Sequence, residues 1–356
     1  MPPTLHLDAA DPVDLAHAAY LLRAGGTVAF ATETVYGLGA NALSPDAVAK
    51  IFTAKHRPEW DPLIVHIASA DALSTIVTIP AVLATRIADL AAIFWPGPLT
   101  LLLPRNASIP DAVTARRPLV GVRVPSHPAA LALLRATGLP IAAPSANTFG
   151  HTSPTTAAHV LADLNGRIDA VLDAGPTTVG LESTVLDPTQ TPMVLYRPGA
   201  VTPEQIAAAT GVAVRIFRAG ILVPPEAPLP ILESSSAFAL PSPGVGIRHY
   251  APRARLVLIE PNQPGDLSHT LLAQNSLEKN VGLRVGLMLP DGWAALPGTT
   301  IFPWGPWEDH AELARRLFDG LRTLDDLAVD VILAPLPPPG GLADAIRDRL
   351  QKAARP

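Results

Sequence analysis

Lys55 and Arg57 are the two residues of this sequence that most clearly invite a chemical interpretation. They stand at the end of a predicted helix that begins with Ser44 as N-cap and Pro45 at the first helical position, and that Pro58 prevents from continuing. A lysine next to an arginine can neutralise phosphate oxygens, the arginine through two parallel hydrogen bonds. We expect both side chains at an exposed helix end, where solvated charges are the commoner case, so the spacing alone leaves phosphate binding open.

Hydroxyl and amide side chains follow apolar segments that favour buried strands. The run 27–30 precedes a predicted polar and glycine-rich turn over 32–39, which contains Thr34. Ser145 and Asn147 follow a later short strand. Ligands of open α/β sheets bind at such strand ends, although a turn or a helix cap explains Ser145 and Asn147 equally well.

Three further residues interrupt or follow apolar strands. Arg123 lies inside the strand 120–124, where a buried guanidinium must be paired or face a ligand. His66 interrupts the strand 63–67, and a histidine there is more often a satisfied core residue than a catalyst. Arg197 follows another strand, at a position where arginines are usually solvated. The sequence thus combines several arginines and a lysine with hydroxyl side chains, but it shows neither a nucleophile–base pair nor a convincing metal-ligand spacing. This combination indicates nucleotide chemistry that works by positioning and charge stabilisation.

The composition excludes several classes of protein. Among 356 residues there is no cysteine, so disulfides, thiolate metal sites and cysteine nucleophiles are absent. The first residues do not resemble a signal peptide, and no apolar stretch approaches the roughly 18 residues of a spanning helix. We therefore expect a cytoplasmic protein without a membrane contact. The net charge of −5 provides no general basic field for nucleic acids.

The order of strand and helix signals predicts two α/β domains joined by a proline-rich linker. Residues 1–214 are expected to form a mixed α/β domain, 215–252 the linker, and 253–356 a small doubly wound domain. The small domain lacks a Gly-x-Gly-x-x-Gly turn, so no dinucleotide is assigned to it. The predicted helices are 12–22, 45–57, 81–93, 128–136, one beginning near 155, 203–209, 266–277, 309–321 and 341–350.

Six short motifs, taken together, resemble one known family. They are TETVYGLG (32–39), KHRP (55–58), PLIVH (62–66), PSAN (144–147), ESTV (182–185) and RHYAP (248–252). The chain resembles the YrdC-type family in its long, two-domain form, the threonylcarbamoyl-AMP synthases. This resemblance covers nearly the whole chain and implies a mixed twisted sheet with helices, followed by a Rossmann-like domain.

The resemblance implies a reaction and its participants. L-threonine, bicarbonate or CO2, and ATP give threonylcarbamoyl-adenylate and pyrophosphate, with Mg2+ bound mainly by the phosphates rather than by protein side chains. Separate proteins then use the product to modify the adenosine beside the anticodon of tRNAs that read ANN codons. Whether the chain itself makes a weak contact with tRNA is left open.

The resemblance also implies roles for individual residues. The residues that match positions around threonine are Thr34, His66, Arg123, Ser145 and Ser183. Those expected near the nucleotide are Lys55, Arg57, Asp61, Leu119, Asn147, Ser153, Thr155, Arg197 and Tyr250, with Lys55 and Arg57 as the catalytic pair. Leu119 and Asp61 depart from the family, where threonine and asparagine are frequent. Tyr250 is expected to close over the nucleotide from the linker.

Three alternatives have distinct signatures. A HypF-like carbamoyl-adenylate transferase shares the YrdC-type domain, but such chains carry cysteine-rich zinc modules. An RNA-binding module is disfavoured by the acidic balance. A sugar-phosphate lyase on a related fold requires acidic metal ligands that the sequence does not offer.

Overall fold

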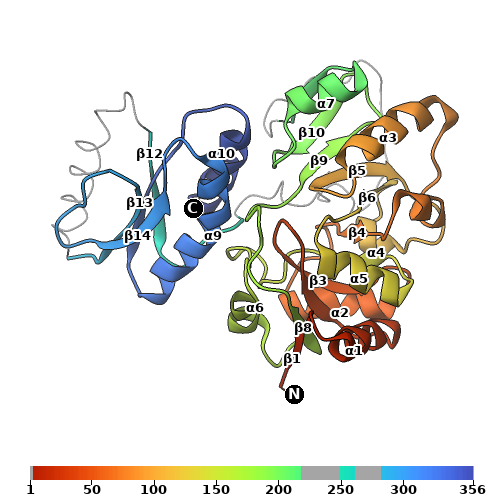
Figure 1. The fold of residues 1–356 in the computed structure, drawn as a ribbon, viewed down its shortest axis with the longest axis horizontal. Helices are drawn as coiled ribbons and strands as arrows, with labels where there is room; N and C mark the ends of the chain where they lie inside the picture. Colours follow the sequence, from red (N-terminus) through yellow and green to blue (C-terminus); the bar gives the residue numbers. More distant parts are fainter. Residues whose placement is uncertain (1–2, 218–248, 261–281, 356) are drawn as a thin grey trace, which may run out of the picture.

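Two β-sheets divide the chain into an N-terminal and a C-terminal part (Figure 1). The computed structural model describes residues 3–217, 249–260 and 282–355. Most of the predicted linker 215–252 and the predicted helix 266–277 lie outside the described residues. The three-part division of the chain therefore stays a prediction.

The N-terminal part is a mixed α/β structure, as predicted. Its sheet has eleven strands in the order β1-β8-β2-β3-β7-β4-β6-β5-β9-β10-β11, with both parallel and antiparallel neighbours. The elements are β1 (Leu5–Asp8), α1 (Pro12–Arg23), β2 (Val28–Ala31), β3 (Tyr36–Asn41), α2 (Pro45–Lys55), β4 (Ile64–His66), the 3-10 helix η1 (Ala70–Thr75), α3 (Ala81–Phe94), β5 (Leu99–Pro104), α4 (Asp111–Thr114), β6 (Leu119–Arg123), α5 (Pro128–Thr137), β7 (Ile141–Ala142), α6 (Ala157–Leu164), β8 (Ala170–Asp173), β9 (Thr184–Asp187), β10 (Met193–Arg197), α7 (Pro203–Thr210) and β11 (Val214–Ile216).

The segment 32–39 is only partly the turn that its glycines predicted. Strand β3 begins at Tyr36 and pairs antiparallel with β2, so the turn is confined to 32–35. A Cβ atom on Gly39 would lie 2.8 Å from the Phe30 ring and 2.9 Å from the Ile141 side chain. Here glycine permits close packing rather than a turn, and for this reason the prediction was wrong for 36–39.

Helix α2 begins at Pro45, as predicted, but it ends at Lys55, two residues before the predicted end at 57, and its end is not exposed. The Ser44 side chain accepts a hydrogen bond from the Ala47 amide, and the helix closes with His56 in a left-handed conformation. Lys55 and Arg57 are only 1% and 8% exposed. The expectation of an exposed helix end was wrong because the segment after β7 folds over it, and the Phe149 amide donates to the Lys55 carbonyl at 2.9 Å.

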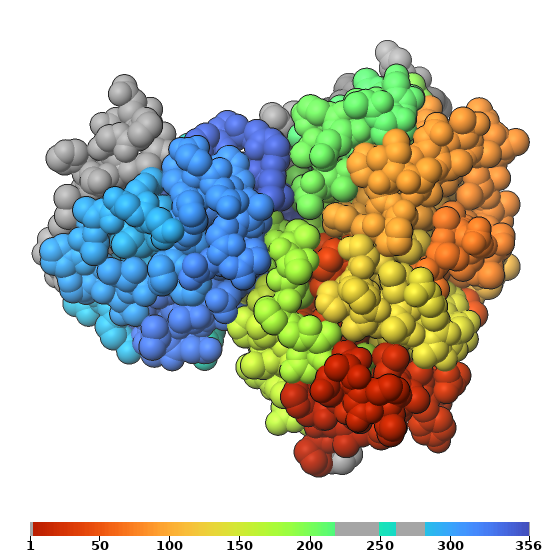
Figure 2. Space-filling model, in the orientation of Figure 1, coloured from red at the N-terminus to blue at the C-terminus, as the bar shows by residue number. Residues whose placement is uncertain are grey.

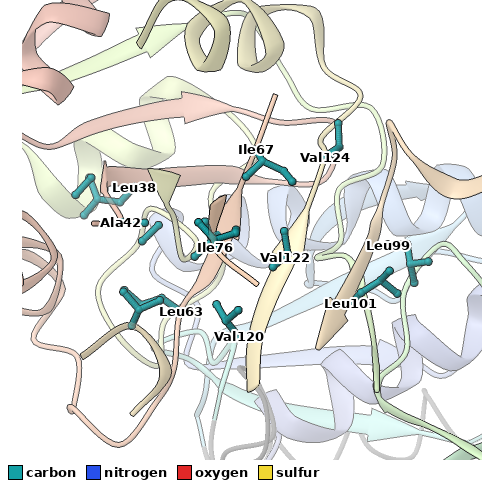
Figure 3. Close-up of a cluster of buried hydrophobic side chains, with 14 of the residues drawn as sticks. Leu38, Ala42, Leu63, Ile67, Ile76, Leu99, Leu101, Val120, Val122 and Val124 are labelled. Carbon is teal, nitrogen blue, oxygen red and sulfur yellow. The ribbon is translucent and has the colours of Figure 1, made fainter. Parts of the chain in front are cut away.

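The main core holds the strands that carry the polar residues. Figure 3 shows buried side chains from β3, β5, β6 and the segments flanking β4 packed in one cluster. Burial of each large aliphatic side chain contributes roughly 1.5–3 kcal/mol. Strands β4 and β6 are parallel neighbours, with His66 opposite Arg123. The core therefore fixes these two side chains at adjacent strand ends.

The C-terminal part has a four-stranded parallel sheet in the order β12-β15-β13-β14. Its elements are β12 (Arg255–Ile259), β13 (Val285–Pro290), β14 (Thr300–Gly305), α9 (His310–Asp326), β15 (Val331–Pro335) and α10 (Leu342–Ala353). Strand β14 was not predicted because it contains Pro303, which an edge strand tolerates. Within the described residues, no helix is long and apolar enough to cross a membrane.

Helices α9 and α10 connect the two parts. Figure 1 shows both helices between the C-terminal sheet and the N-terminal part, and Figure 2 shows the C-terminal part in contact with the yellow-green segment of the N-terminal part. Arg322 of α9 forms an ion pair with Asp163 at 3.2 Å, and Arg349 of α10 forms one with Glu182 at 2.6 Å. Charged side chains of the C-terminal part thus reach into the first part.

Candidate active site

A cavity lies where the ends of β4 and β6, the turn before β3 and the residue pairs 182–183 and 249–250 meet. Its apolar wall includes Val35, Ile64 and Ala143. The predicted site residues in the wall are Thr34, Arg57, His66, Arg123, Ser145, Ser183, Arg197 and Tyr250. Residues that are more than 200 positions apart in the sequence, such as Thr34 and Tyr250, thus face one space.

One side of the cavity is organised around Arg123. Its Nη1 donates to Thr34 Oγ1 at 2.9 Å, and its Nη2 lies 2.6 Å from Glu33 Oε1. The other oxygen of Glu33 accepts from the Ser126 amide at 3.1 Å. Burial opposes the ionisation of Glu33, but Arg123 outweighs it and lowers the pKa of the carboxyl. Arg123 is therefore both paired and directed at the cavity.

His66 adds a neutral imidazole to the same side. Burial, reinforced by Arg123, lowers its pKa to about 3. The ring meets Phe30 edge-on at 6.1 Å, and Nδ1 is buried without a hydrogen-bond partner among the described residues. Because an unsatisfied buried nitrogen is costly, a ligand group is the natural partner for it.

Arg57 and Lys55 have different surroundings. Arg57 lies in the wall, where its Nη2 is 2.9 Å from an Asp61 carboxylate oxygen and 2.7 Å from the Pro62 carbonyl. Lys55 is outside the wall, and its Nζ donates to the backbone carbonyls of Ser145, at 2.5 Å, and Asn147. Burial, together with Arg57, lowers the pKa of Lys55 well below its usual value. Lys55 thus supports the turn that presents Ser145.

Another part of the wall combines Ser183, Arg197 and Tyr250. Arg197 donates through Nε to the Ser183 carbonyl at 3.0 Å and through Nη2 to Ser183 Oγ at 3.1 Å. The His249 and Tyr250 rings pack at 4.1 Å between centroids, and His249 also meets Phe149 at 5.6 Å. Ser183 is thus oriented by an arginine, and an aromatic pair closes this side.

The remaining predicted residues lie behind the wall. Asp61 holds Arg57, Ser153 donates to a Glu182 carboxylate oxygen, and Thr155 contacts His159 Nδ1 at 3.3 Å. The Asn147 side chain donates hydrogen bonds to the carbonyls of Thr148 and His151 at 2.8 and 2.9 Å. Leu119 packs against a small apolar cluster around Ile64. The structure places these side chains, with Lys55, where they support the wall.

Two polar wall residues were not assigned from the sequence: Glu182 and His249. Each lies within a quoted motif, next to a residue that was assigned. Beyond its motif, the run 181–186 gave no further signal for Glu182, because it also contains the polar residues Ser183 and Thr184. Among the described residues there is no group of three or more histidine, aspartate or glutamate side chains that could hold a metal ion.

The fold and the cavity define a two-domain α/β protein of the YrdC type. Residues 20–199 match the family model Sua5_yciO_yrdC, described as telomere recombination, and residues 201–355 match the model of the threonylcarbamoyl-AMP synthase C-terminal domain. Together the two models span nearly all of the chain, which belongs to the threonylcarbamoyl-AMP synthase family.

Individual relatives agree with this assignment. The chain is 42% identical over 353 residues to the threonylcarbamoyl-AMP synthase of Bacillus subtilis, covering 99% of this chain and 95% of the relative. It is 41% identical over 342 residues to that of Pyrococcus abyssi, covering 95% and 93%. The crystal structure of Pyrococcus abyssi Sua5 complexed with L-threonine superposes with a TM-score of 0.85 at 37% identity and covers 99% of this chain and 97% of its own.

Proposed function

We propose that this chain condenses L-threonine, bicarbonate and ATP to threonylcarbamoyl-AMP, releasing pyrophosphate and water. The main support for this proposal is that Arg123, which Thr34 and Glu33 orient, lines the same cavity as Arg57 and Arg197. One space thus offers a cation to an amino acid carboxylate and two cations to phosphates.

The threonine side is assigned to Thr34, His66, Arg123 and Ser183. The Pyrococcus abyssi relative, at 37% identity, has been crystallised with L-threonine. In the present chain, the Arg123 guanidinium suits the threonine carboxylate, and the hydroxyls of Thr34 and Ser183 suit polar groups of the amino acid. The His66 imidazole is neutral, so it adds no positive charge that would repel the amino group of threonine.

The nucleotide side is assigned to Arg57, Arg197 and Tyr250, while Ser145 keeps its predicted place near threonine. Arg57 and Arg197 offset the charge that gathers on the α-phosphate, while the Tyr250 ring offers an apolar face. Mg2+, when bound, neutralises the phosphates of ATP and of the departing pyrophosphate. The wall carboxylate Glu182 is engaged by Ser153 and Arg349, so we infer that the phosphates supply most of the ligands for this ion.

The bonds that form are an N–C bond and an O–P bond. The neutral amine of threonine attacks CO2, formed by dehydration of bicarbonate, and loses a proton to give a carbamate. A carbamate oxygen then attacks the α-phosphorus, and the bond to pyrophosphate breaks. Both steps gather negative charge in a buried space, where fixed guanidinium groups stabilise it more strongly than water does.

The deciding test is pyrophosphate release from ATP by the full-length protein in the presence of Mg2+. Release is expected only when L-threonine and bicarbonate are both present, and the adenylate should appear in equal amount by mass spectrometry. Release that is independent of threonine would contradict the proposal.

We infer that separate proteins use the adenylate to modify tRNAs that read ANN codons. A direct RNA contact is the competing interpretation. Titration of tRNA at several salt concentrations decides between them, because phosphate contacts weaken steeply with salt. Absence of salt-dependent tRNA binding at micromolar protein would favour transfer through a partner.

A further inference from the structure

Arg349 of α10 is a buried arginine of the C-terminal part that lies behind the cavity wall, where it contacts the wall residue Glu182. Its side chain is 0% exposed, and its Nε donates to Glu182 Oε2 at 2.6 Å. Its Nη2 donates to the Pro198 carbonyl at 3.0 Å, directly after Arg197. One guanidinium therefore joins the C-terminal part to the two segments that carry Ser183 and Arg197.

Glu182 is fixed from both sides. Its Oε1 accepts from the Ser153 hydroxyl, and its Oε2 from Arg349. Burial opposes the ionisation of Glu182, but Arg349 and then Arg197 outweigh it and lower the pKa of the carboxyl. The backbone of Ser183, which Arg197 also holds, follows Glu182 directly. A shift of Glu182 would consequently be passed to a residue assigned to the substrate.

Arg349 also holds Tyr250. The guanidinium carbon lies 5.1 Å from the centre of the Tyr250 ring, and Phe318 of α9 packs against that ring at 5.7 Å. Tyr250 has a φ of 65°, a left-handed conformation that is unfavourable for a residue other than glycine. A strained backbone of this kind persists only where the surrounding groups hold it in place. Two of these groups, Arg349 and Phe318, belong to the C-terminal part.

We propose that Arg349 is a positioning residue through which the C-terminal part fixes Glu182 and Tyr250 at the nucleotide side of the cavity. This inference rests on the proposed function, because the assignment of the nucleotide to this side comes from there. Arg349 touches no reacting atom.

The test compares full-length variants at two positions of the same helix. Arg349→Met removes the guanidinium at similar volume, and Arg349→Lys retains the charge without the planar fork. Arg347→Met is the matched control, since Arg347 pairs with Glu260 at 2.7 Å and donates to the Pro337 carbonyl, both within the C-terminal part. Pyrophosphate release gives KM for ATP and kcat, and calorimetric titration with ATP gives Kd.

We expect Arg349→Met to raise KM and Kd for ATP about tenfold, while kcat changes less than about threefold. The reason is that the lost binding is the same in the ground state and in the transition state. Arg349→Lys should recover part of this loss, and Arg347→Met should equal the wild type. A purely structural role predicts instead fewer active molecules, hence a lower kcat with unchanged KM and Kd. That result would overturn the proposal.

A second comparison covers the case in which Arg349→Met fails to fold because Glu182 is left unpaired. Arg349→Met combined with Glu182→Gln removes both charges, and it is measured against Glu182→Gln alone. A further rise in Kd for ATP supports the proposal, and equal Kd values overturn it. If the wild type binds ATP but releases no pyrophosphate, the proposed reaction fails while the Kd comparison still decides the role of Arg349. If the wild type binds no ATP, both fail.

Discussion

Two buried arginine–carboxylate pairs flank the cavity, and they differ in where their partners come from. Arg123 and Glu33 belong to the N-terminal part, whereas Glu182 is paired with Arg349 from the C-terminal part. Both pairs have a shortest separation of 2.6 Å, and both lower the pKa of a carboxyl that burial would otherwise raise. The first arginine faces the cavity, while the second lies behind Glu182.

The difference shows how one kind of ion pair can have two uses. In the first pair the carboxylate orients an arginine toward the predicted amino acid site. In the second pair the arginine orients a carboxylate and a tyrosine, and it couples the site to another part of the chain. Removal of the first pair should abolish substrate recognition, whereas removal of the second should weaken it.

The largest effect is expected from neutralising the first pair. Arg123→Met with Glu33→Gln removes both charges and leaves none unpaired in the interior. We expect kcat/KM for threonine to fall about a thousandfold, roughly 4 kcal/mol, because a charge-assisted contact and the orientation of Thr34 are lost together. Steady-state kinetics measure the loss. The same neutralisation of the exposed pair Arg284–Asp330 is the control and should leave kcat/KM unchanged.

Arg57 provides the next largest effect, on the nucleotide side. Arg57→Ala should lower kcat/KM for ATP about a hundredfold, through the loss of a phosphate contact worth about 2–3 kcal/mol. It should also lower the melting temperature, since Asp61 is left charged and buried. Adding Asp61→Asn should restore the melting temperature but not the activity. Recovery of both would mean that Arg57 serves only the fold.

The pH dependence of stability tests two histidines: His66, which is buried beside Arg123, and His159, which is partly buried near Arg322. Burial lowers the pKa of His66 to about 3 and that of His159 to about 4. Below pH 6.5 the unfolded chain takes up protons that the folded chain does not, so the free energy of unfolding falls as the pH falls toward 4. Each such histidine contributes roughly 1.4 kcal/mol per pH unit.

Urea unfolding at pH 7.5, 6 and 5 measures how the free energy of unfolding changes with pH. His66→Asn should make this dependence shallower by the contribution of one histidine. An unchanged slope in that variant would show that His66 is protonated in the folded protein.

The smallest effect concerns the side chain of the amino acid. We expect threonine to be preferred over serine about tenfold in kcat/KM, because one buried methyl group is worth about 1 kcal/mol. The apolar wall near Arg123 contains Ile64 and Ala143, which are suited to that methyl group. Equal kcat/KM values for the two amino acids would place the methyl group in solvent.

The sequence by itself determined the local features of this protein. Each end of helix α2 follows from residues within about one turn of that end: the Ser44 cap at its start and the proline after its last residues. Arg123 lies inside an apolar strand, so it had to be paired or to face a ligand. The motifs also predicted the family, which the family models confirm. These inferences succeed because capping, periodicity and the cost of burying a charge depend on few neighbouring residues.

Only the tertiary structure decided which distant groups meet. Lys55 is buried because a segment 90 residues later accepts its hydrogen bonds, and Gly39 stands in a strand because Phe30 and Ile141 leave no room for a side chain. Arg349 lies 167 residues from Glu182, and no local pattern relates them. Such contacts depend on how whole elements pack, and many residues far apart in the chain set that packing at once.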